Sequence, residues 1–223
     1  SMLNSLKYAS LATVFDLVFG GLAAWLIVRA RVRCRQVLDG VVMLPLAVPG
    51  MILAAGYVAM TARNWTGGWL GEQLVAIGPG RNPFWLLVIA YAVRRIPFMV
   101  RGVSAGLQQV PVSLEEAARN LGSSQVSAIR RITLPLISAN ILAAAVLTFT
   151  FAMLEVSDSL ILAQTQDHYP ITKQIYDLAA STGSPQTGYQ AAALGVYGMV
   201  MLAATMAIAG ALLGRRLGAI FRA

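Results

Sequence analysis

Long apolar segments alternate with short polar segments along the chain. Five of them predict membrane-spanning helices, because a helix needs about 20 mostly apolar residues to cross a bilayer. The predicted spans cover residues 3–28, 37–62, 84–103, 134–163 and 188–213. Pro45 and Pro49 interrupt the second span, where a kink is expected, and Arg94, Arg95 and Arg101 interrupt the third. The pattern predicts an all-α integral membrane protein that forms one domain over residues 1–223.

The composition supports a membrane protein over a soluble one. Hydrophobic residues make up 57% of the 223 residues and charged residues 12%, whereas charged residues make up about 25% of a typical soluble domain. The chain is nevertheless basic, with a net charge of +8. A basic chain can be a nucleic-acid binder or a membrane protein with basic loops.

The positions of the positive charges separate these two classes. Thirteen of the 17 Lys and Arg residues fall after the first span, from the end of the third span to the fourth, and after the fifth span. These regions share one side of a five-span topology. The four on the opposite side are Lys7, Arg63, Arg81 and Lys173. Because the arginines alternate with spans, no nucleic-acid partner is expected, and the positive-inside rule places the N-terminus outside and the C-terminus in the cytoplasm.

The predicted cytoplasmic segment 104–133 carries the most specific pattern. Ser113 and Glu116 have the spacing of a capping box, and Gly122 stands where a left-handed residue would close a short helix. One apolar stripe at helical spacing lies between them, formed by Leu114, Ala117, Ala118 and Leu121. A helix of about two turns is marginal by itself, so it is expected to pack on another surface.

A longer motif surrounds this short helix. Glu116-Ala117-Ala118, then Gly122, then Ile132, Leu134 and Pro135 match the pattern E-A-A-x3-G-x9-I-x-L-P at every specified position. This pattern resembles the EAA motif of binding-protein-dependent ABC importer permeases of the type I fold. The five predicted spans resemble the five-transmembrane-helix core of that family, so the resemblance covers nearly the whole chain. Some members carry an additional helix before this core or fuse two cores, and the sequence leaves both arrangements open.

The resemblance implies that this loop forms a cytoplasmic coupling helix, which docks in a groove of an ATP-binding cassette subunit. The implied docking residues are Leu114, Glu115, Glu116, Ala117, Ala118, Leu121 and Gly122, with Ile132, Leu134 and Pro135 at the junction to the fourth span. The alternative is a loop helix that packs on the chain's own surface.

The resemblance also implies other partners. They are a periplasmic or lipid-anchored solute-binding protein, a second permease core (a homodimer or a fused half) and the lipid of the bacterial inner membrane. The chain contains no G-x-x-x-x-G-K-[ST] motif for nucleotide phosphates. ATP and Mg are therefore expected on the partner ATPase, and no cofactor, metal site or catalytic site is expected on this chain. It is expected to be a transport subunit rather than an enzyme, and the alternative class is a passive channel or a membrane scaffold.

Ionisable residues inside predicted spans are functional candidates. Glu155 and Asp158 share one helix face and lie roughly 31 Å along the helix from Leu134, close to the outer interface. Arg94 and Arg95 lie about 15 Å into the third span. All four are candidates for the substrate path. Structural alternatives are a solvated or arginine-paired role for the carboxylates, with Arg63 or Arg81 as partner, and packing roles for the arginines. Asp16, in the first span, is expected to face protein.

Three short segments indicate a subfamily. Residues 94–98 (RRIPF), 155–160 (EVSDSL) and 170–176 (PITKQIY) are similar to permeases of the ferric-iron uptake group. Relatives of that group import phosphonate, thiamine, polyamine or sulfate. Ferric iron is the expected substrate, since Fe³⁺ prefers oxygen ligands such as carboxylates, and those other solutes remain alternatives.

Overall fold

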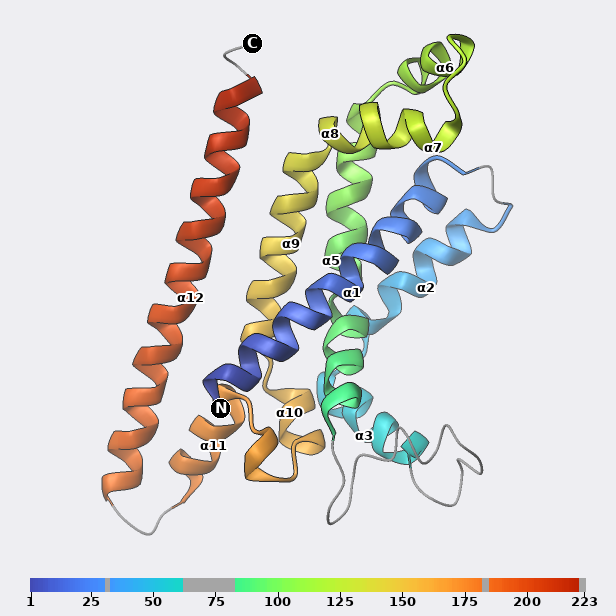
Figure 1. Cartoon of the computed structure of the whole chain (residues 1–223). Helices are drawn as coiled ribbons and strands as arrows, with labels where there is room; N and C mark the ends of the chain where they lie inside the picture. The colour runs from blue at the N-terminus through green and yellow to red at the C-terminus, as the bar shows by residue number, and fades with distance from the viewer. Residues whose placement is uncertain (31–32, 62–82, 182–184, 221–223) are drawn as a thin grey trace.

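The computed structural model describes residues 1–30, 33–61, 83–181 and 185–220, and the regular structure in these residues is helical (Figure 1). The elements are α1 (Met2–Val28), α2 (Arg35–Ala47), α3 (Gly50–Thr61), α5 (Phe84–Gln109), α6 (Val112–Asn120), α7 (Gln125–Ala128), the π-helix η1 (Ile129–Thr133), α8 (Leu134–Leu136), α9 (Ser138–Met153), α10 (Ser157–Leu162), the 3-10 helix η2 (Gln166–His168), α11 (Ile171–Ala180) and α12 (Pro185–Ile220). The all-α prediction is confirmed for this part of the chain.

The central helix is α5, which packs against α1 and α9. Small residues allow the helix backbones to approach closely. A Cβ atom added at Gly102 of α5 would lie 2.5 Å from the Cβ of Ala144 in α9, and one added at Gly20 of α1 would lie 2.9 Å from the Cγ of Met99 in α5. Close contacts of this kind stabilise helix pairs in membranes, where van der Waals packing replaces the hydrophobic effect between helices.

Two helices in the described residues are long and apolar enough to cross a membrane, namely α1 and residues Pro185–Ile208 of α12. Two bent helix pairs raise the number to four if each pair is one span. They are Arg35–Ala47 with Gly50–Met60, bent by 103°, and Gln125–Leu136 with Ser138–Met153, bent by 69°. Helix α5 has 26 residues, which is a length of about 39 Å, but three arginines interrupt its apolar sequence.

The kink expected in the second predicted span, residues 37–62, is a complete break of the helix. The chain turns between α2 and α3 at Val48, whose backbone is extended with φ −95° and ψ 129°. The residue before a proline is driven out of the helical region by the proline ring, and Pro49 has no N–H to continue the helix. Pro45, by contrast, stays inside α2. The second predicted span is therefore a sharply broken pair of helices.

The prediction of a single helix over residues 134–163 is wrong. A bend at Ile137 separates α8 from α9, α9 ends at Met153, and α10 begins at Ser157. As helices, the other three predicted segments differ from the structure only in their bounds. The third continues to Gln109, and the fifth lies within the longer helix Pro185–Ile220.

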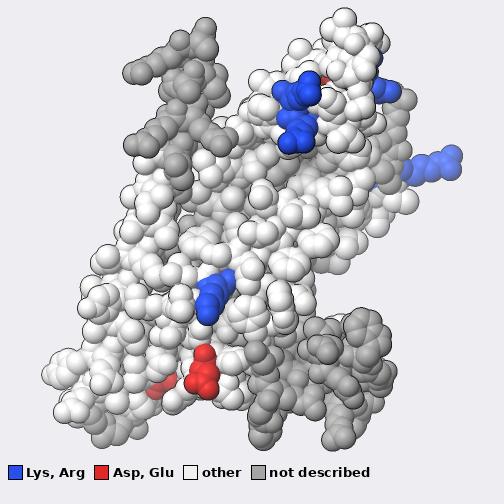
Figure 2. Space-filling model, viewed as in Figure 1, with Lys and Arg blue, Asp and Glu red and all other residues white. Residues whose placement is uncertain are grey.

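The molecule has two distinct ends. The first residue of α1 and the last turn of α12 lie at opposite ends (Figure 1). Helices α6, α7 and α8 lie at one end, here called the α6 end, and α3, α10 and α11 lie at the other, here called the α11 end. The visible face in Figure 2 is mostly uncharged, and several of its Lys and Arg side chains gather at the α6 end. This distribution agrees with a basic α6 end beside a surface of low charge.

Candidate functional site

The predicted coupling loop begins with α6, whose first residue is Val112. The N-cap residue is Pro111, in an extended conformation, and no side chain caps the helix. The predicted capping box over Ser113 and Glu116 is therefore wrong, because both residues already lie inside the helix. Pro111 favours the start of a helix without a side-chain cap, because its ring holds φ near the helical value and it has no N–H that needs a hydrogen-bond partner.

The end of α6 is closed by Gly122, as predicted. Its φ is +90°, the single positive φ in the described residues. The N–H of Gly122 donates to the carbonyl of Arg119 at 2.9 Å, and the N–H of Ser123 donates to the carbonyl of Ala118 at 3.0 Å. These two bonds form a Schellman motif, in which a left-handed glycine turns the chain out of the helix. The chain can then reverse into α7, where Ser124 caps the new helix by accepting from the N–H of Ser127.

Most of the predicted docking residues are exposed. Leu121 is 88% exposed and Leu114 42%, although large apolar side chains are normally buried. Ala118 and Ile132 are half-buried, and the exposed members of the set are Leu114, Glu116, Ala117, Leu121, Gly122, Leu134 and Pro135. The described residues of this chain leave this face of the loop uncovered. A pocket of about 670 Å³ lies beside it, lined by Glu116, Arg119, Asn120, Gly122, Ser123, Ser124 and Gln125.

Glu115 differs from the rest of the predicted docking set. It is 9% exposed and points into the protein. Its Oε1 accepts a hydrogen bond of 2.8 Å from the hydroxyl of Thr133 and lies 3.7 Å from the Nε of Arg29. The motif comparison placed Glu115 with the docking residues, but in the structure it joins α6 to the membrane helices. Arg29 and Thr133 were not singled out from the sequence, because Arg29 looked like one of many basic loop residues and Thr133 occupies the unspecified position of the I-x-L-P segment.

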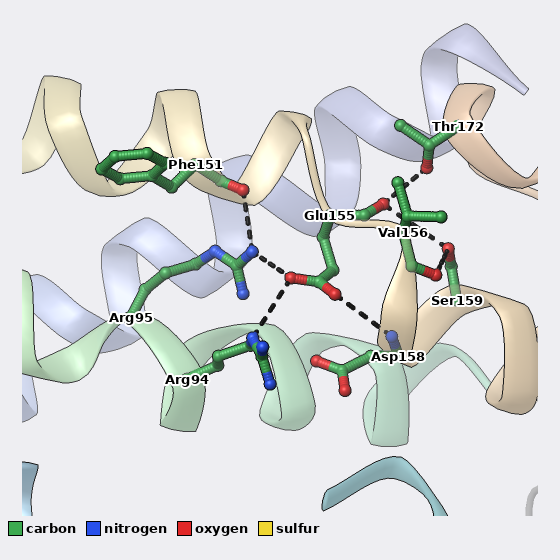
Figure 3. A network of polar contacts seen from close by, with 8 residues as sticks. All are labelled: Arg94, Arg95, Phe151, Glu155, Val156, Asp158, Ser159 and Thr172. Atoms are coloured by element: carbon green, nitrogen blue, oxygen red, sulfur yellow. Dashed lines mark hydrogen bonds and ion pairs between the residues drawn. The ribbon is translucent and has the colours of Figure 1, made fainter. Parts of the chain in front are cut away.

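The four candidates for the substrate path form one buried cluster near the α11 end (Figure 3). Arg95 donates from Nη2 to the Glu155 carboxylate and to the carbonyl oxygen of Phe151, the latter at 2.8 Å. The Nε of Arg94 lies 3.5 Å from the same carboxylate. Arg95 and Glu155 are each 5% exposed. Two guanidinium groups of α5 therefore hold one carboxylate that follows the end of α9.

The other carboxylate oxygen of Glu155 contacts the first turn of α10. Its Oε1 accepts from the N–H of Asp158 at 3.1 Å, and a carboxylate at the first turn stabilises a helix. The hydroxyl of Thr172, in α11, donates to the carbonyl of Glu155 at 2.5 Å. Asp158 is 1% exposed, and neither of its carboxylate oxygens has a hydrogen-bond partner among the described residues. The cluster thus connects α5, the break after α9, α10 and α11.

Helix α3 closes the cluster from another side. A Cβ atom at Gly50 would lie 2.6 Å from the Cβ of Ser157 and 2.7 Å from both terminal nitrogens of Arg94. The start of α3 can press against the guanidinium group only because residue 50 has no side chain. The sequence suggested ion pairs of Glu155 with Arg63 or Arg81, which lie outside the described residues. Asp16 is 1% exposed, so the expectation that it faces protein is confirmed.

The chain is similar to known proteins over most of its length. The sequence profile of the family described as "Binding-protein-dependent transport system inner membrane component" matches residues 16–222. The chain is 38% identical over 151 residues to the molybdenum transport system permease protein ModB of Escherichia coli K12, covering 67% of this chain and 65% of that protein. It is 33% identical over 147 residues to the sulfate transport system permease protein CysT of Salmonella typhimurium, covering 66% and 52%.

A third relative belongs to the group expected from the sequence. The ferric transport system permease protein FbpB of Actinobacillus pleuropneumoniae is 29% identical over 208 residues, covering 93% of this chain and 27% of that protein. The chain thus spans about half to two thirds of the length of the first two relatives and about a quarter of the third.

Solved structures share the fold. A bacterial ABC transporter involved in the import of the acidic polysaccharide alginate matches with a TM-score of 0.74 and 21% identity, covering 96% of this chain and 78% of that chain. The MetNI methionine ABC transporter in an inward-facing conformation matches with a TM-score of 0.70 and 15% identity, covering 96% and 93%. The arrangement of helices around α5 is therefore that of an ABC importer permease.

Proposed function

Because this chain belongs to the family of binding-protein-dependent transport system inner membrane components, we propose that it is the permease subunit of an ATP-driven solute importer. The observation that carries this proposal is the uncovered face of α6, which bears the EAA motif and is closed by Gly122. A passive channel or a scaffold has no need of such a face. The expected location is the inner membrane, with the N-terminus of this segment outside and the α6 end in the cytoplasm.

The α6 face is proposed to dock in a groove of an ATP-binding cassette subunit. Ala117 and Gly122 allow a close approach of the partner's backbone because they have little or no side chain, and Leu114 and Leu121 provide apolar contacts beside them. Leu134 and Pro135 extend the same exposed surface to the start of α8. ATP and Mg would be bound by that partner. Burial of Leu121, which is 88% exposed here, would contribute to the affinity.

The remaining surfaces suit the other partners. Helix α12 presents large exposed apolar side chains, including Val196, Met199 and Val200, which fit membrane lipid or a second permease core. A substrate-delivering binding protein would approach the α11 end. The ion-pair cluster of Arg94, Arg95 and Glu155 lies near that end, and its contacts to α10 and α11 make it a candidate outer gate.

An oxyanion is the best-supported substrate class. ModB is named as a permease for molybdenum and CysT as a permease for sulfate. Sulfate is a doubly charged oxyanion, and so is molybdate, the common form of molybdenum in water. Guanidinium groups bind oxyanions well, but Arg94 and Arg95 are paired with Glu155 in this structure, so the support for this substrate class comes from the two relatives. Ferric iron remains the second candidate because of the similarity to FbpB. The carboxylate of Glu155, however, is held by Arg94 and Arg95 and is not free to act as an iron ligand.

Co-purification and uptake test the proposal. The chain is expressed with an ATP-binding cassette ATPase and a solute-binding protein from the same organism, and the membrane complex is isolated in detergent. The ATPase is expected to co-purify with the unmodified chain and to be lost with Ala117→Asp, which puts a charge in the docking face. Proteoliposomes are then supplied with molybdate, sulfate or ferric iron as separate substrates. An unmodified complex without ATPase would refute the permease function, and ATP-dependent uptake of iron alone would refute the oxyanion.

A further inference from the structure

The ends of two membrane helices are joined by one buried arginine at the α6 end. Arg29 is the C-cap residue of α1, and its side chain is 7% exposed. Its Nη2 donates to the carbonyl oxygens of Leu107, at 3.0 Å, and Val110, at 2.6 Å. Leu107 lies in the last turn of α5 and Val110 is its C-cap residue, where a cation is favoured by the helix dipole. Arg29 therefore ties the end of α1 to the end of α5.

Glu115 connects α6 and η1 to Arg29. Its Oε1 lies 3.7 Å from the Nε of Arg29 and accepts the hydrogen bond from the hydroxyl of Thr133. Thr133 is the last residue of η1, directly before the helices α8 and α9, and is 1% exposed. A buried carboxylate is tolerated only when it is paired and hydrogen-bonded. Arg29, Glu115 and Thr133 therefore hold α1, α5, α6 and η1 in one arrangement.

The rest of α6 makes few contacts with the body of the protein. Within Val112–Asn120, the described structure buries Glu115 alone. The neighbouring residues Leu114, Glu116 and Ala117 are exposed. Among the described residues, Glu115 makes the ion-pair and side-chain hydrogen-bond contacts of α6 with α1 and η1, in addition to the packing of α6 against α7 and η1. Glu115 is therefore one route by which a displacement of the exposed face reaches α1 and η1.

We propose that Arg29, Glu115 and Thr133 form a joint that transmits movements of the docked α6 to α1, α5 and α9 together. The proposal rests on the function proposed above, because it needs an ATPase that moves α6. Glu115 and Thr133 act as positioning residues. They lie beneath the docking face and determine how a movement of α6 becomes a movement of the membrane helices. When the joint is weakened, α6 still docks, but its movement is no longer shared with the helices.

The test uses the complete importer in liposomes and measures solute uptake and ATP hydrolysis in the same sample. Glu115→Gln keeps the size of the side chain and one acceptor oxygen but removes the charge beside Arg29. Thr133→Val removes the hydroxyl with little change of shape, and Thr133→Ser restores a hydroxyl at the same position. Asp39→Asn is the control, because it removes the Arg101–Asp39 ion pair, a more exposed pair at 3.1 Å.

For Glu115→Gln and Thr133→Val, the ATPase is expected to co-purify in wild-type amounts. The amount of solute imported per ATP hydrolysed is expected to fall roughly tenfold, which corresponds to losing one hydrogen bond to a charged group. Thr133→Ser and Asp39→Asn are expected to keep the wild-type ratio. The serine variant separates a role of the hydroxyl bond from a general effect of mutating the loop.

Three results would overturn the joint. The first is a wild-type uptake ratio in Glu115→Gln and Thr133→Val, and the second is an equal loss in Thr133→Ser. The third is loss of the ATPase from the Glu115→Gln complex, because Glu115 would then belong to the docking contact itself. Failure of the unmodified chain to retain an ATPase is a different outcome, since it would refute the proposed function and the joint along with it.

Discussion

Arg95 and Glu155 are 60 residues apart in the chain and form a buried ion pair between α5 and the break that follows α9. Each residue is 5% exposed, and each makes a second contact with the backbone, Arg95 to the carbonyl of Phe151 and Glu155 to the N–H of Asp158. The pair therefore holds the end of one helix, the start of another and the centre of α5 in register.

Glu155→Gln is expected to destabilise the protein strongly. It leaves the buried guanidinium group of Arg95 without a counter-charge, and breaking a buried ion pair from one side costs about 3–5 kcal/mol. Thermal denaturation of the purified complex in detergent measures this effect. Arg94→Gln is the matched comparison, because the Arg94 side chain is 24% exposed and its Nε lies 3.5 Å from the carboxylate. Its cost is expected to be about 1 kcal/mol or less, and equal losses in both variants would contradict this account of the cluster.

Gly122→Val is expected to abolish coupled transport, whereas Gly122→Asn is expected to retain most of it. The φ of +90° at this position is accessible to glycine, is tolerated by asparagine and is strained for a β-branched residue. The valine variant should straighten the chain after α6 and displace the docking face. Solute uptake by whole cells, normalised to the amount of protein in the membrane, measures both variants. If valine and asparagine behave alike, the left-handed closure is not what positions the loop.

Gly50→Ala is expected to lower both thermal stability and uptake. The added methyl group would come within 2.7 Å of the Arg94 guanidinium nitrogens and 2.6 Å of Ser157, so α3 or the cluster has to move. Gly56→Ala, in the same helix, has nothing within 4 Å of the added atom and should be neutral or stabilising by about 0.5–1 kcal/mol. A shift in the melting temperature that is the same for both variants would count against the close approach of α3.

Gly102→Ala tests the packing of α5 against α9. Its methyl group would lie 2.5 Å from the Cβ of Ala144, and overpacking of this kind typically costs about 1–3 kcal/mol. Removing the opposing methyl group should restore the space, so the double variant Gly102→Ala with Ala144→Gly is expected to recover much of the lost stability. Denaturation of the two single variants and the double variant gives the coupling energy. Simple additivity of the two single effects would contradict the predicted contact.

The sequence by itself determined the fold class and the position of the loop that carries the EAA motif. Both depend on local signals: the length of apolar segments, the alternation of positive charge with them, and the spacing of Glu116, Ala117, Ala118 and Gly122 in one short helix. The left-handed turn at Gly122 could also be predicted, because it depends on the conformational freedom of a single residue.

The contacts between distant segments were decided by the tertiary structure. The burial of Glu115 against Arg29 and Thr133, and the pairing of Glu155 with Arg95, join residues far apart in the chain, and no local pattern indicates which charges will meet. The tertiary structure also decided the helix breaks after Ala47 and Met153. Pro49 makes a break after Ala47 possible, but the same sequence is compatible with a span that is only kinked there. Burying a charge is costly unless a partner is present. The packing of α1, α5 and α9 therefore decided which ionisable residues are buried in pairs and which remain on the surface.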